Sequence, residues 1–322
     1  MIAVCGEALI DLVPAGEPGL WRAIPGGGPA NTAVALARLG TPSSLLCRLS
    51  GDGFGARIRA HLEANGVDLS WAPEAAEQSS VAVADLDDKG AARYGFYLRG
   101  TADWQWSADE LPERLPEDTA CLHVGSLAAV LPPGDAVLRD WARTQRDSVA
   151  VCYDVNVRPA VRPDADAYRE SVRAWLDLAH IVKVSDDDLA WLAPGERPTD
   201  VVRGWMERYG LWLGVLTLGK DGAVAVLPGG ESIAVPGVHV EVADTVGAGD
   251  AFIAAMLAEL EPLLPRTQTA GAMDIDGAQV EPALRFATAA AALACTRSGA
   301  HAPDRGEVDS LMAATGHAHR DG

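Results

Sequence analysis

The stretch that decides the fold is Asp244-Thr245-Val246-Gly247-Ala248-Gly249-Asp250-Ala251-Phe252. Alternating valines at positions 238, 240 and 242 predict a strand before it, and small apolar residues from Ala251 to Leu260 predict a helix after it. The glycines at this junction let backbone N–H groups approach one point without interference from a Cβ atom. Because a helix N-terminus carries unpaired donors and partial positive charge, the junction predicts an anion site beside the carboxylate of Asp250.

An anion site next to a carboxylate is what phosphoryl transfer to an alcohol requires. The turn Gly247-Ala248-Gly249 would hold the migrating group, and Asp250 would orient and deprotonate the hydroxyl. A structural alternative is a glycine-rich turn that Asp250 merely caps. The whole nonapeptide, however, resembles the C-terminal signature of the PfkB/ribokinase family of carbohydrate kinases.

A second glycine-rich junction lies near the N-terminus, at Pro25-Gly26-Gly27-Gly28-Pro29-Ala30-Asn31. Alone it is also typical of a flexible turn with a helix cap. It is similar to the family's N-terminal signature, which implies that Gly27, Gly28 and Asn31 hold a sugar. Both signatures occur in the family's order. We therefore expect one kinase domain over residues 1–315 and a disordered tail at 316–322.

The composition agrees with a globular protein of 322 residues in which 48% are hydrophobic. The net charge of −19 disfavours non-specific binding to nucleic acid or anionic membranes, because phosphates would be repelled. Five scattered cysteines suit a reducing cytoplasm. The N-terminus reads as a strand rather than a signal peptide, and no apolar run is long enough to predict a membrane span. We expect a cytoplasmic protein without nucleic-acid or membrane partners.

Strand-like and helix-like segments alternate, which favours βαβ units with a parallel sheet covered on both faces. The expected strands are Ile2–Cys5, Ser44–Leu49, Ala120–Val124, Val149–Tyr153, Ile181–Val184 and Leu213–Leu218. The expected helices are 30–39, 54–64, 134–146, 165–178 and 199–209, and after Asp250 the chain should be helical except for a loop at Pro262–Glu281. The fold class is α/β, and the resemblance implies a ribokinase-like three-layer sandwich with a mostly parallel central sheet.

Two segments interrupt this alternation, at about 11–25 and 79–103. Their alternating β patterns and turn residues predict a small accessory sheet at the edge of the core. We expect this sheet to act as a lid over the site, and its exposed strand edges could pair in a homodimer.

Further polar residues follow predicted strands, where ligands of open α/β sheets bind. Asp11 follows the first strand, and the resemblance implies that it grips sugar hydroxyls. Tyr97-Leu98-Arg99 to Asp103 resembles a fructokinase and 2-keto-3-deoxygluconate kinase segment, which implies sugar binding by Arg99. Asp154, Asn156 and Arg158 match the D-x-N-x-R of fructokinase-like members and are expected to face the same cleft. Each of these could instead be an ordinary solvated or turn residue.

The nucleotide side is predicted from three more segments. Where the family has N-x-x-E for Mg²⁺, this chain has Ser185 and Asp188, and the shorter Asp188 is expected to act on Mg²⁺ through water. Thr217, Gly219 and Gly222 resemble the family's nucleotide-contacting T-x-G-x-x-G, joined by Ala248 and Gly249. Gly214 to Asp221 resembles a Walker A motif but lacks its Ser/Thr and the helix that should follow. Neither a dinucleotide fingerprint nor zinc spacing is found in the sequence.

The resemblance also implies a monovalent-cation site, formed here by carbonyl groups near Asp244, Thr245, Ser298 and Gly299, and we expect K⁺ there.

The predicted function is ATP- and Mg²⁺-dependent phosphorylation of a sugar, with fructose to fructose 6-phosphate preferred. Other acceptors in the family remain open: 2-keto-3-deoxygluconate, ribose or a nucleoside. A protein of another class, a catalytically silent sugar- or nucleotide-binding regulator, is the remaining alternative.

Overall fold

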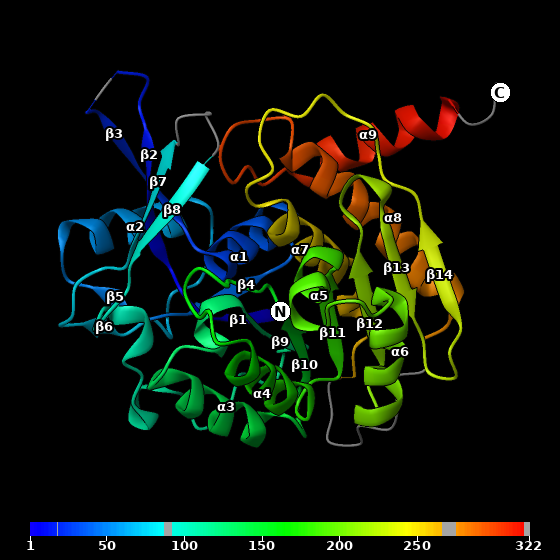
Figure 1. Cartoon of the computed structure of the whole chain (residues 1–322), viewed down its shortest axis with the longest axis horizontal. Coiled ribbons are helices and arrows are strands. Elements are labelled where there is room, and N and C mark those ends of the chain that lie inside the picture. Colours follow the sequence, from blue (N-terminus) through cyan, green and yellow to red (C-terminus); the bar gives the residue numbers. More distant parts are fainter. Residues whose placement is uncertain (18, 87–91, 266–274, 319–322) are drawn as a thin grey trace.

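A central eight-stranded sheet organises the molecule, in the order β14-β13-β12-β11-β10-β9-β1-β4 (Figure 1). This computed structural model describes residues 1–17, 19–86, 92–265 and 275–318. The strands are β1 Ile2–Cys5, β4 Ser43–Leu46, β9 Cys121–Gly125, β10 Ala150–Asp154, β11 Ile181–Ser185, β12 Leu213–Thr217, β13 Ala223–Val226 and β14 Ser232–Val235. All neighbours from β4 to β12 pair in parallel, and β13 and β14 add an antiparallel hairpin.

Helices cover both faces of this sheet because its strands are apolar on both sides. In β1, Ile2 and Val4 pack into one core cluster, whereas Ala3 and Cys5 pack into the other. The first cluster includes α1 Gly28–Arg38, α7 Ala248–Leu260 and α8 Gly277–Ala294, with α9 Arg305–Ala318 packed on α8. The second includes α3 Gly134–Gln145, α4 Ala165–Leu176, α5 Asp186–Leu192 and α6 Pro198–Tyr209.

The second sheet is separate and has four strands in the order β3-β2-β7-β8; we name it the lid after its expected role. Its strands are β2 Leu9–Pro14, β3 Trp21–Gly26, β7 Val81–Leu86 and β8 Ala92–Tyr97, and α2 Gly53–Ala64 packs against β2 and β3. Two short strands, β5 Leu49–Ser50 and β6 Glu74–Ala75, pair beside it. Short 3-10 turns occupy Ala102–Trp104, Ala108–Glu110, Ser126–Ala129, Gly219–Asp221 and Glu261–Leu263.

The expected α/β fold with a mostly parallel sheet and a small second sheet is confirmed. The strand predicted across Val238, Val240 and Val242 is wrong: residues 236–247 contain no strand, and Val242 is 58% exposed. Alternating valines need a neighbouring strand to pair with. The edge of the sheet is instead occupied by the β13–β14 hairpin, and the amides of Ala243 and Asp244 bond to the carbonyl of Cys295.

Three boundaries also differ from the sequence prediction. The strand expected at Ser44–Leu49 is divided into β4 and β5, which pair with different partners. Helix α8 begins at Gly277, because Asp276 and Gln279 form a capping box, so the predicted loop extends too far. Helix α9 continues to Ala318, so residues 316–318 do not belong to a disordered tail. Residues 319–322 lie outside the described part of the chain.

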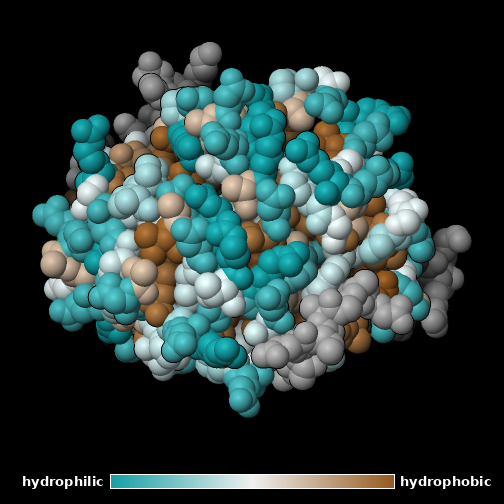
Figure 2. Space-filling model, turned by 90° about the horizontal axis from the view of Figure 1, so that it is seen from below, coloured by the Kyte–Doolittle hydropathy of each residue, from teal (hydrophilic) through white to brown (hydrophobic). Residues whose placement is uncertain are grey.

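Hydrophilic residues dominate the face seen in Figure 2, with apolar residues in small groups between them. Of the helices among the described residues, none is long and apolar enough to cross a membrane.

Candidate functional site

The first turn of α7 forms a cluster of backbone donors. Gly247 has a φ of 79°, and a Cβ atom there would lie 2.8 Å from the Cβ of Ala300, so glycine is required for both conformation and space. The amide of Ala251 bonds to the carbonyl of Gly247, and that of Ala248 bonds to the carbonyl of Thr245. The amides of Gly249 and Asp250 have no acceptor among the described residues. This geometry can bind an anion at the helix N-terminus.

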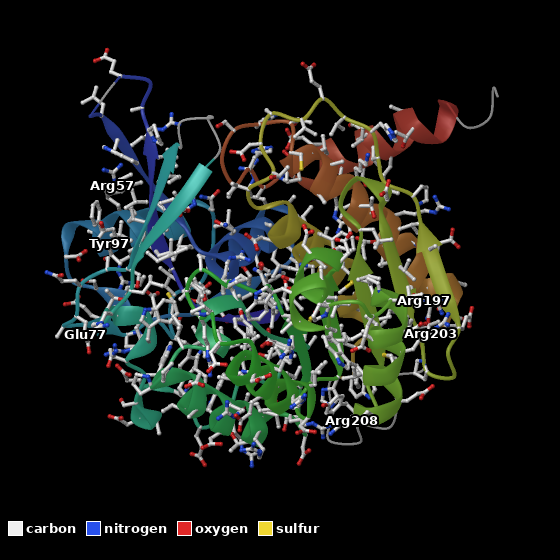
Figure 3. All side chains as sticks on the ribbon, viewed as in Figure 1. Arg57, Glu77, Tyr97, Arg197, Arg203 and Arg208 are labelled. Carbon is white, nitrogen blue, oxygen red and sulfur yellow. The ribbon has the colours of Figure 1, made fainter. Side chains whose placement is uncertain are left out.

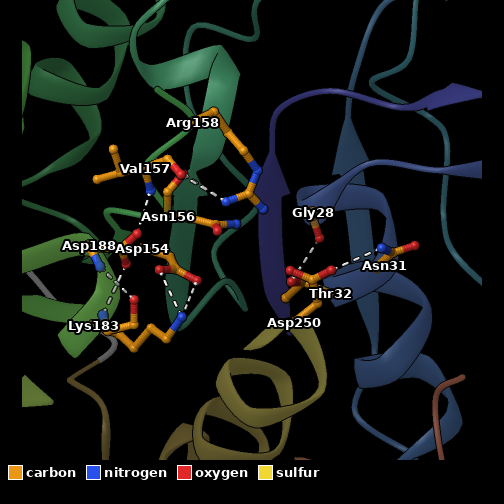
Figure 4. Close-up of polar contacts among 11 residues, drawn as sticks. Gly28, Asn31, Thr32, Asp154, Asn156, Val157, Arg158, Lys183, Asp188 and Asp250 are labelled. Carbon is orange, nitrogen blue, oxygen red and sulfur yellow. Dashed lines mark hydrogen bonds and ion pairs between the residues drawn. The ribbon is translucent and has the colours of Figure 1, made fainter. Parts of the chain in front are cut away.

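Asp250 lies in this turn with a buried side chain (Figure 4). Its Oδ2 accepts a hydrogen bond of 2.9 Å from the Nδ2 of Asn31 on α1. Burial raises its pKa, whereas the Asn31 hydrogen bond and the nearby Arg158 and Lys183 lower it. A Cβ atom on Gly28 would lie 3.3 Å from Oδ1. The absence of a side chain at Gly28 therefore leaves space in front of the carboxylate for a small ligand.

The predicted sugar residues at the base of the lid gather around this space. A Cβ on Gly26 would collide with Oδ2 of Asp11, and a Cβ on Gly27 would lie 2.7 Å from the carbonyl oxygen of Glu7. Burial raises the pKa of Asp11 to about 6, reinforced by Asp250 and opposed by Arg158. The carboxylate of Asp250 and the guanidinium of Arg158 are therefore close enough to Asp11 to influence its charge.

The segment after β10 contributes both an amide and a cation. Asn156 has a φ of 38°, which is uncommon for a residue other than glycine, and its Nδ2 would lie 3.2 Å from a Cβ on Gly28. Arg158 donates to the carbonyl of Val157 at 3.0 Å, and its side chain extends toward the same side as Asn156 (Figure 4). The carboxylate of Asp154, by contrast, is already paired within the protein. Lys183 Nζ lies 3.2 and 3.1 Å from its two oxygens.

Asp188 connects α5 to the segment after β10. Its Oδ1 accepts the amide of Val157 at 2.8 Å, and its Oδ2 accepts the amide of Ser185 at 3.0 Å. Ser185 in turn caps α5 through its hydroxyl. Each carboxylate oxygen retains a lone pair, so Asp188 can still accept a hydrogen bond from a metal-bound water.

The residues predicted for the nucleotide follow neighbouring strands. Thr217, at the end of β12, pairs in register with Ser185, at the end of β11. Gly219 and Gly222 have φ values of 53° and 102° in the turn before β13. A Cβ on Gly222 would collide with the carbonyl of Val235, so packing alone already requires glycine there.

Asp244 brings together the two segments predicted for the cation. Its Oδ2 accepts the amide of Gly299 at 2.8 Å, and its Oδ1 accepts the amide of Val246 at 3.1 Å. Thr245 and Ser298 are exposed beside it. The contact fixes the turn before α7 against the end of α8.

Arg99, which is predicted to bind sugar, lies in the segment that follows the last strand of the small sheet. It is exposed just beyond β8, and among the described residues it has no hydrogen bond or ion pair. Figure 3 places the neighbouring Tyr97 on the lid side of the molecule, opposite Arg203 on α6. In the same segment, Asp103 is buried and accepts the amide of Ala8 at 2.9 Å, so it anchors the lid to the core.

Sequence reasoning missed Glu7, Ser126 and Lys183. Burial raises the pKa of Glu7 to about 7, although hydrogen bonds from Ser126 and from the Ala128 amide oppose this shift. Ser126 has a φ of 59°, and its Cβ would lie 3.6 Å from a Cβ on Gly28. The sequence held a signal for two of them: Glu7 is an acidic residue just after the first strand, and Lys183 is a charged residue inside an apolar strand.

Comparison with known proteins identifies the family. Residues 1–305 match the pfkB family carbohydrate kinases. The chain is 33% identical to a fructokinase of Klebsiella pneumoniae over 93% of this chain and 94% of that protein. It is also 33% identical to a fructokinase of Rhizobium leguminosarum bv. trifolii, over 84% and 83% of the two chains.

Solved structures agree with this assignment. A fructokinase from Xylella fastidiosa with bound ATP superposes with a TM-score of 0.88 at 27% identity, covering 98% of both chains. An aminoimidazole riboside kinase from Salmonella enterica superposes with a TM-score of 0.82 at 28% identity, covering 97% of this chain and 99% of that one. The chain belongs to the pfkB family of carbohydrate kinases, as its two glycine-rich signatures predict.

Proposed function

We propose that this protein transfers the γ-phosphoryl group of ATP to a hydroxyl of fructose, giving fructose 6-phosphate. The observation that supports this most directly is the position of Asp250. Its carboxylate lies in the donor-rich first turn of α7, faces the space left by Gly28 and is oriented by Asn31. Fructokinases from several organisms are among the most similar relatives.

The proposed reaction begins with the sugar hydroxyl hydrogen-bonded to Asp250. Asp250 accepts the hydroxyl proton while the sugar oxygen attacks the γ-phosphorus and the bond from that phosphorus to the β–γ bridging oxygen breaks. ADP leaves with the electron pair of that bond. The amides of Gly249 and Asp250 would stabilise the charge on the transferring group, which is the largest contribution expected in such sites.

The sugar would be oriented from the side of the lid. Asp11 and Asn156 present hydrogen-bonding groups near Gly27, Gly28 and Asn31, and Arg158 adds positive charge on the same side. Arg99 would have to reach the sugar by movement of β8 and the segment after it. Its sugar-binding role stays part of the proposal.

Mg²⁺ and K⁺ belong to the proposal as well. Among the described residues, no group of three or more His, Cys, Asp or Glu side chains could hold a metal ion. This fits Mg²⁺ in nucleotide sites, where one or two carboxylates act together with waters and phosphates. Asp188 would hold such waters, and bound Mg²⁺ would neutralise phosphate charge.

Carbonyl groups around Asp244, Thr245, Ser298 and Gly299 would hold K⁺. Structural neighbours include a Vibrio cholerae fructokinase with fructose, ADP and potassium.

Ribosides form the competing class of acceptor, since an aminoimidazole riboside kinase is also similar. Release of ADP should therefore be measured with fructose, ribose, 2-keto-3-deoxygluconate and aminoimidazole riboside at equal concentrations. We expect the highest kcat/KM with fructose. A preference for another acceptor would overturn the fructose assignment, and failure to phosphorylate any of them would favour a silent sugar- or nucleotide-binding regulator.

The five cysteines are unpaired, and four of them are buried, which suits the reducing cytoplasm that we propose as the compartment of this protein.

We also propose a homodimer through the lid. The edge strands of the lid are β3 and β8, and Trp21 and Tyr97 on them are 42% and 69% exposed.

A further inference from the structure

Lys183 is a buried cation in the middle of a strand. It lies in β11, within the run Ile181-Val182-Lys183-Val184, and only 4% of it is exposed. A buried ammonium group is costly unless it is paired. Asp154 on the neighbouring strand β10 provides the pair, with its two oxygens 3.1 and 3.2 Å from Nζ. Burial lowers the pKa of Lys183, but Asp154, Asp188 and Asp250 together raise it, so the group stays protonated.

The ammonium group lies against the first turn of α7. A Cβ atom on Gly249 would lie 3.3 Å from Nζ of Lys183. Figure 4 shows Lys183 and Asp154 on one side of this helix end and Asp250 with Asn31 on the other. A cation at a helix N-terminus opposes the helix dipole. The ion pair with Asp154 therefore explains why the ammonium group can be buried, but not why it lies at this turn. An anion bound at the turn would interact favourably with both the ammonium group and the helix.

We propose that Lys183 is a catalytic residue of phosphoryl transfer, contacting the oxygens of the γ-phosphoryl group at the first turn of α7. Asp154 is then a positioning residue that holds Nζ beside Gly249, rather than a ligand of the sugar. The inference rests on the proposed kinase function. Lys183 keeps its protons throughout the reaction, since the hydroxyl proton passes to Asp250. Its charge compensates the negative charge that spreads over the phosphoryl oxygens.

The test removes the charge while keeping the packing. Lys183→Met alone leaves Asp154 buried without its partner, and we expect this variant to be unstable. The double variant Lys183→Met/Asp154→Asn removes both charges with little change in side-chain volume. We expect it to unfold near the wild-type temperature, yet to lose at least ~10²-fold in kcat, the range for removal of one donor to a developing oxyanion. The KM for fructose should change little.

A structural ion pair would behave differently. If Lys183 only stabilises the fold, the double variant should regain wild-type kcat together with its stability, and this outcome would overturn the proposal. Lys183→Arg provides a second readout: a cation role predicts partial recovery of kcat compared with Lys183→Met/Asp154→Asn.

Arg48 provides the matched control. It is a buried cation paired with Glu77 and Glu110, and in the described part of the chain none of its hydrogen bonds or ion pairs reaches α7. Arg48→Met should lower thermal stability but leave kcat of the folded enzyme near the wild-type value. If wild-type protein phosphorylates no sugar, the proposed function fails. If the wild type is active and the double variant is equally active, the assignment of Lys183 alone fails.

Discussion

At the scale of single residues, the site depends on how Asp250 is held. Its carboxylate is buried, bonded to Asn31 and adjacent to free backbone donors, so both its orientation and its charge are set by the surrounding structure. Asp11 contributes a second carboxyl whose charge is coupled to that of Asp250.

Asp250→Asn should lower kcat by at least ~10²-fold, because the amide cannot accept the hydroxyl proton. The KM for fructose should change little, since Asp11, Asn31 and Asn156 would still hold the sugar. Steady-state ADP release measures both constants. Asp309→Asn, on the exposed part of α9, is the control. A variant that retained nearly native kcat would remove Asp250 from the catalytic role.

The pH dependence should reflect these buried carboxyls. Burial raises the pKa of Asp250, and Glu7 adds to this effect while Asn31, Arg158 and Lys183 oppose it. The pKa of Asp11 is raised to about 6. Asp250 must be ionised to act as the base, and Asp11 must be ionised to accept hydrogen bonds from the sugar. We therefore expect kcat/KM to fall as the pH is lowered through about 6, where Asp11 takes up a proton.

Measurement of kcat/KM between about pH 8 and 5 checks this profile, with circular dichroism to confirm that the protein stays folded. In Asp11→Asn, the carboxyl group whose pKa is raised to about 6 is absent, so the fall of kcat/KM near this pH should disappear. A flat profile in this range would contradict the role of buried carboxyls.

At the scale of elements, the lid and the segment after α8 are each joined to one of the two glycine-rich turns. The lid connects to α1 through Gly26 and Gly27, directly beside Asp11. Sugar binding there should therefore order the lid strands and exclude water.

Hydrogen exchange over residues 79–99 should slow when fructose is bound. ATP hydrolysis without acceptor should be slow for the same reason, because the open lid leaves the site incomplete. The helix α6, on the far side of the molecule, provides the internal control. Equal protection of residues 79–99 with and without saturating fructose would argue against closure.

The end of α8 should make the enzyme sensitive to monovalent cations. Asp244 ties Gly299 to the turn before α7, so an ion bound there would stabilise the anion-binding turn without touching the sugar. Replacement of K⁺ by tetramethylammonium at constant ionic strength should lower kcat more than it raises KM. An unchanged kcat would mean that protein contacts alone preorganise the turn.

At the scale of the whole molecule, the lid leaves two sheet edges accessible, with Trp21 and Tyr97 exposed on them. Unpaired strand edges favour association with another chain. Light scattering of wild-type protein should show a dimer, and Trp21→Lys/Tyr97→Lys should shift it to monomer. Leu263→Lys, at an exposed apolar residue outside the lid, should leave the dimer intact. A monomeric wild type would refute this interface.

Local sequence determined most of the elements and both glycine-rich junctions. The parallel strands of the central sheet follow from short apolar runs, apart from the end of β4, because a strand buried on both faces needs no polar alternation. Gly247 and Gly27 are recognisable because their positive φ and close contacts exclude other residues. The apolar runs and the positive φ values are constraints within a few residues, so they can be seen in one sequence. The contacts of Gly247 with Ala300 and of Gly27 with Glu7 depend on the fold.

Only the tertiary structure decided which side chains meet. Asn31 with Asp250, Asp154 with Lys183 and Glu7 with Ala128 join segments that are far apart in the chain. Their contacts depend on the order of strands in the sheet and on which helix covers each face, which periodicity does not encode. For the same reason the valines before Asp244 form no strand. A polar residue after a strand marks the edge where a site forms, but packing selects its partner.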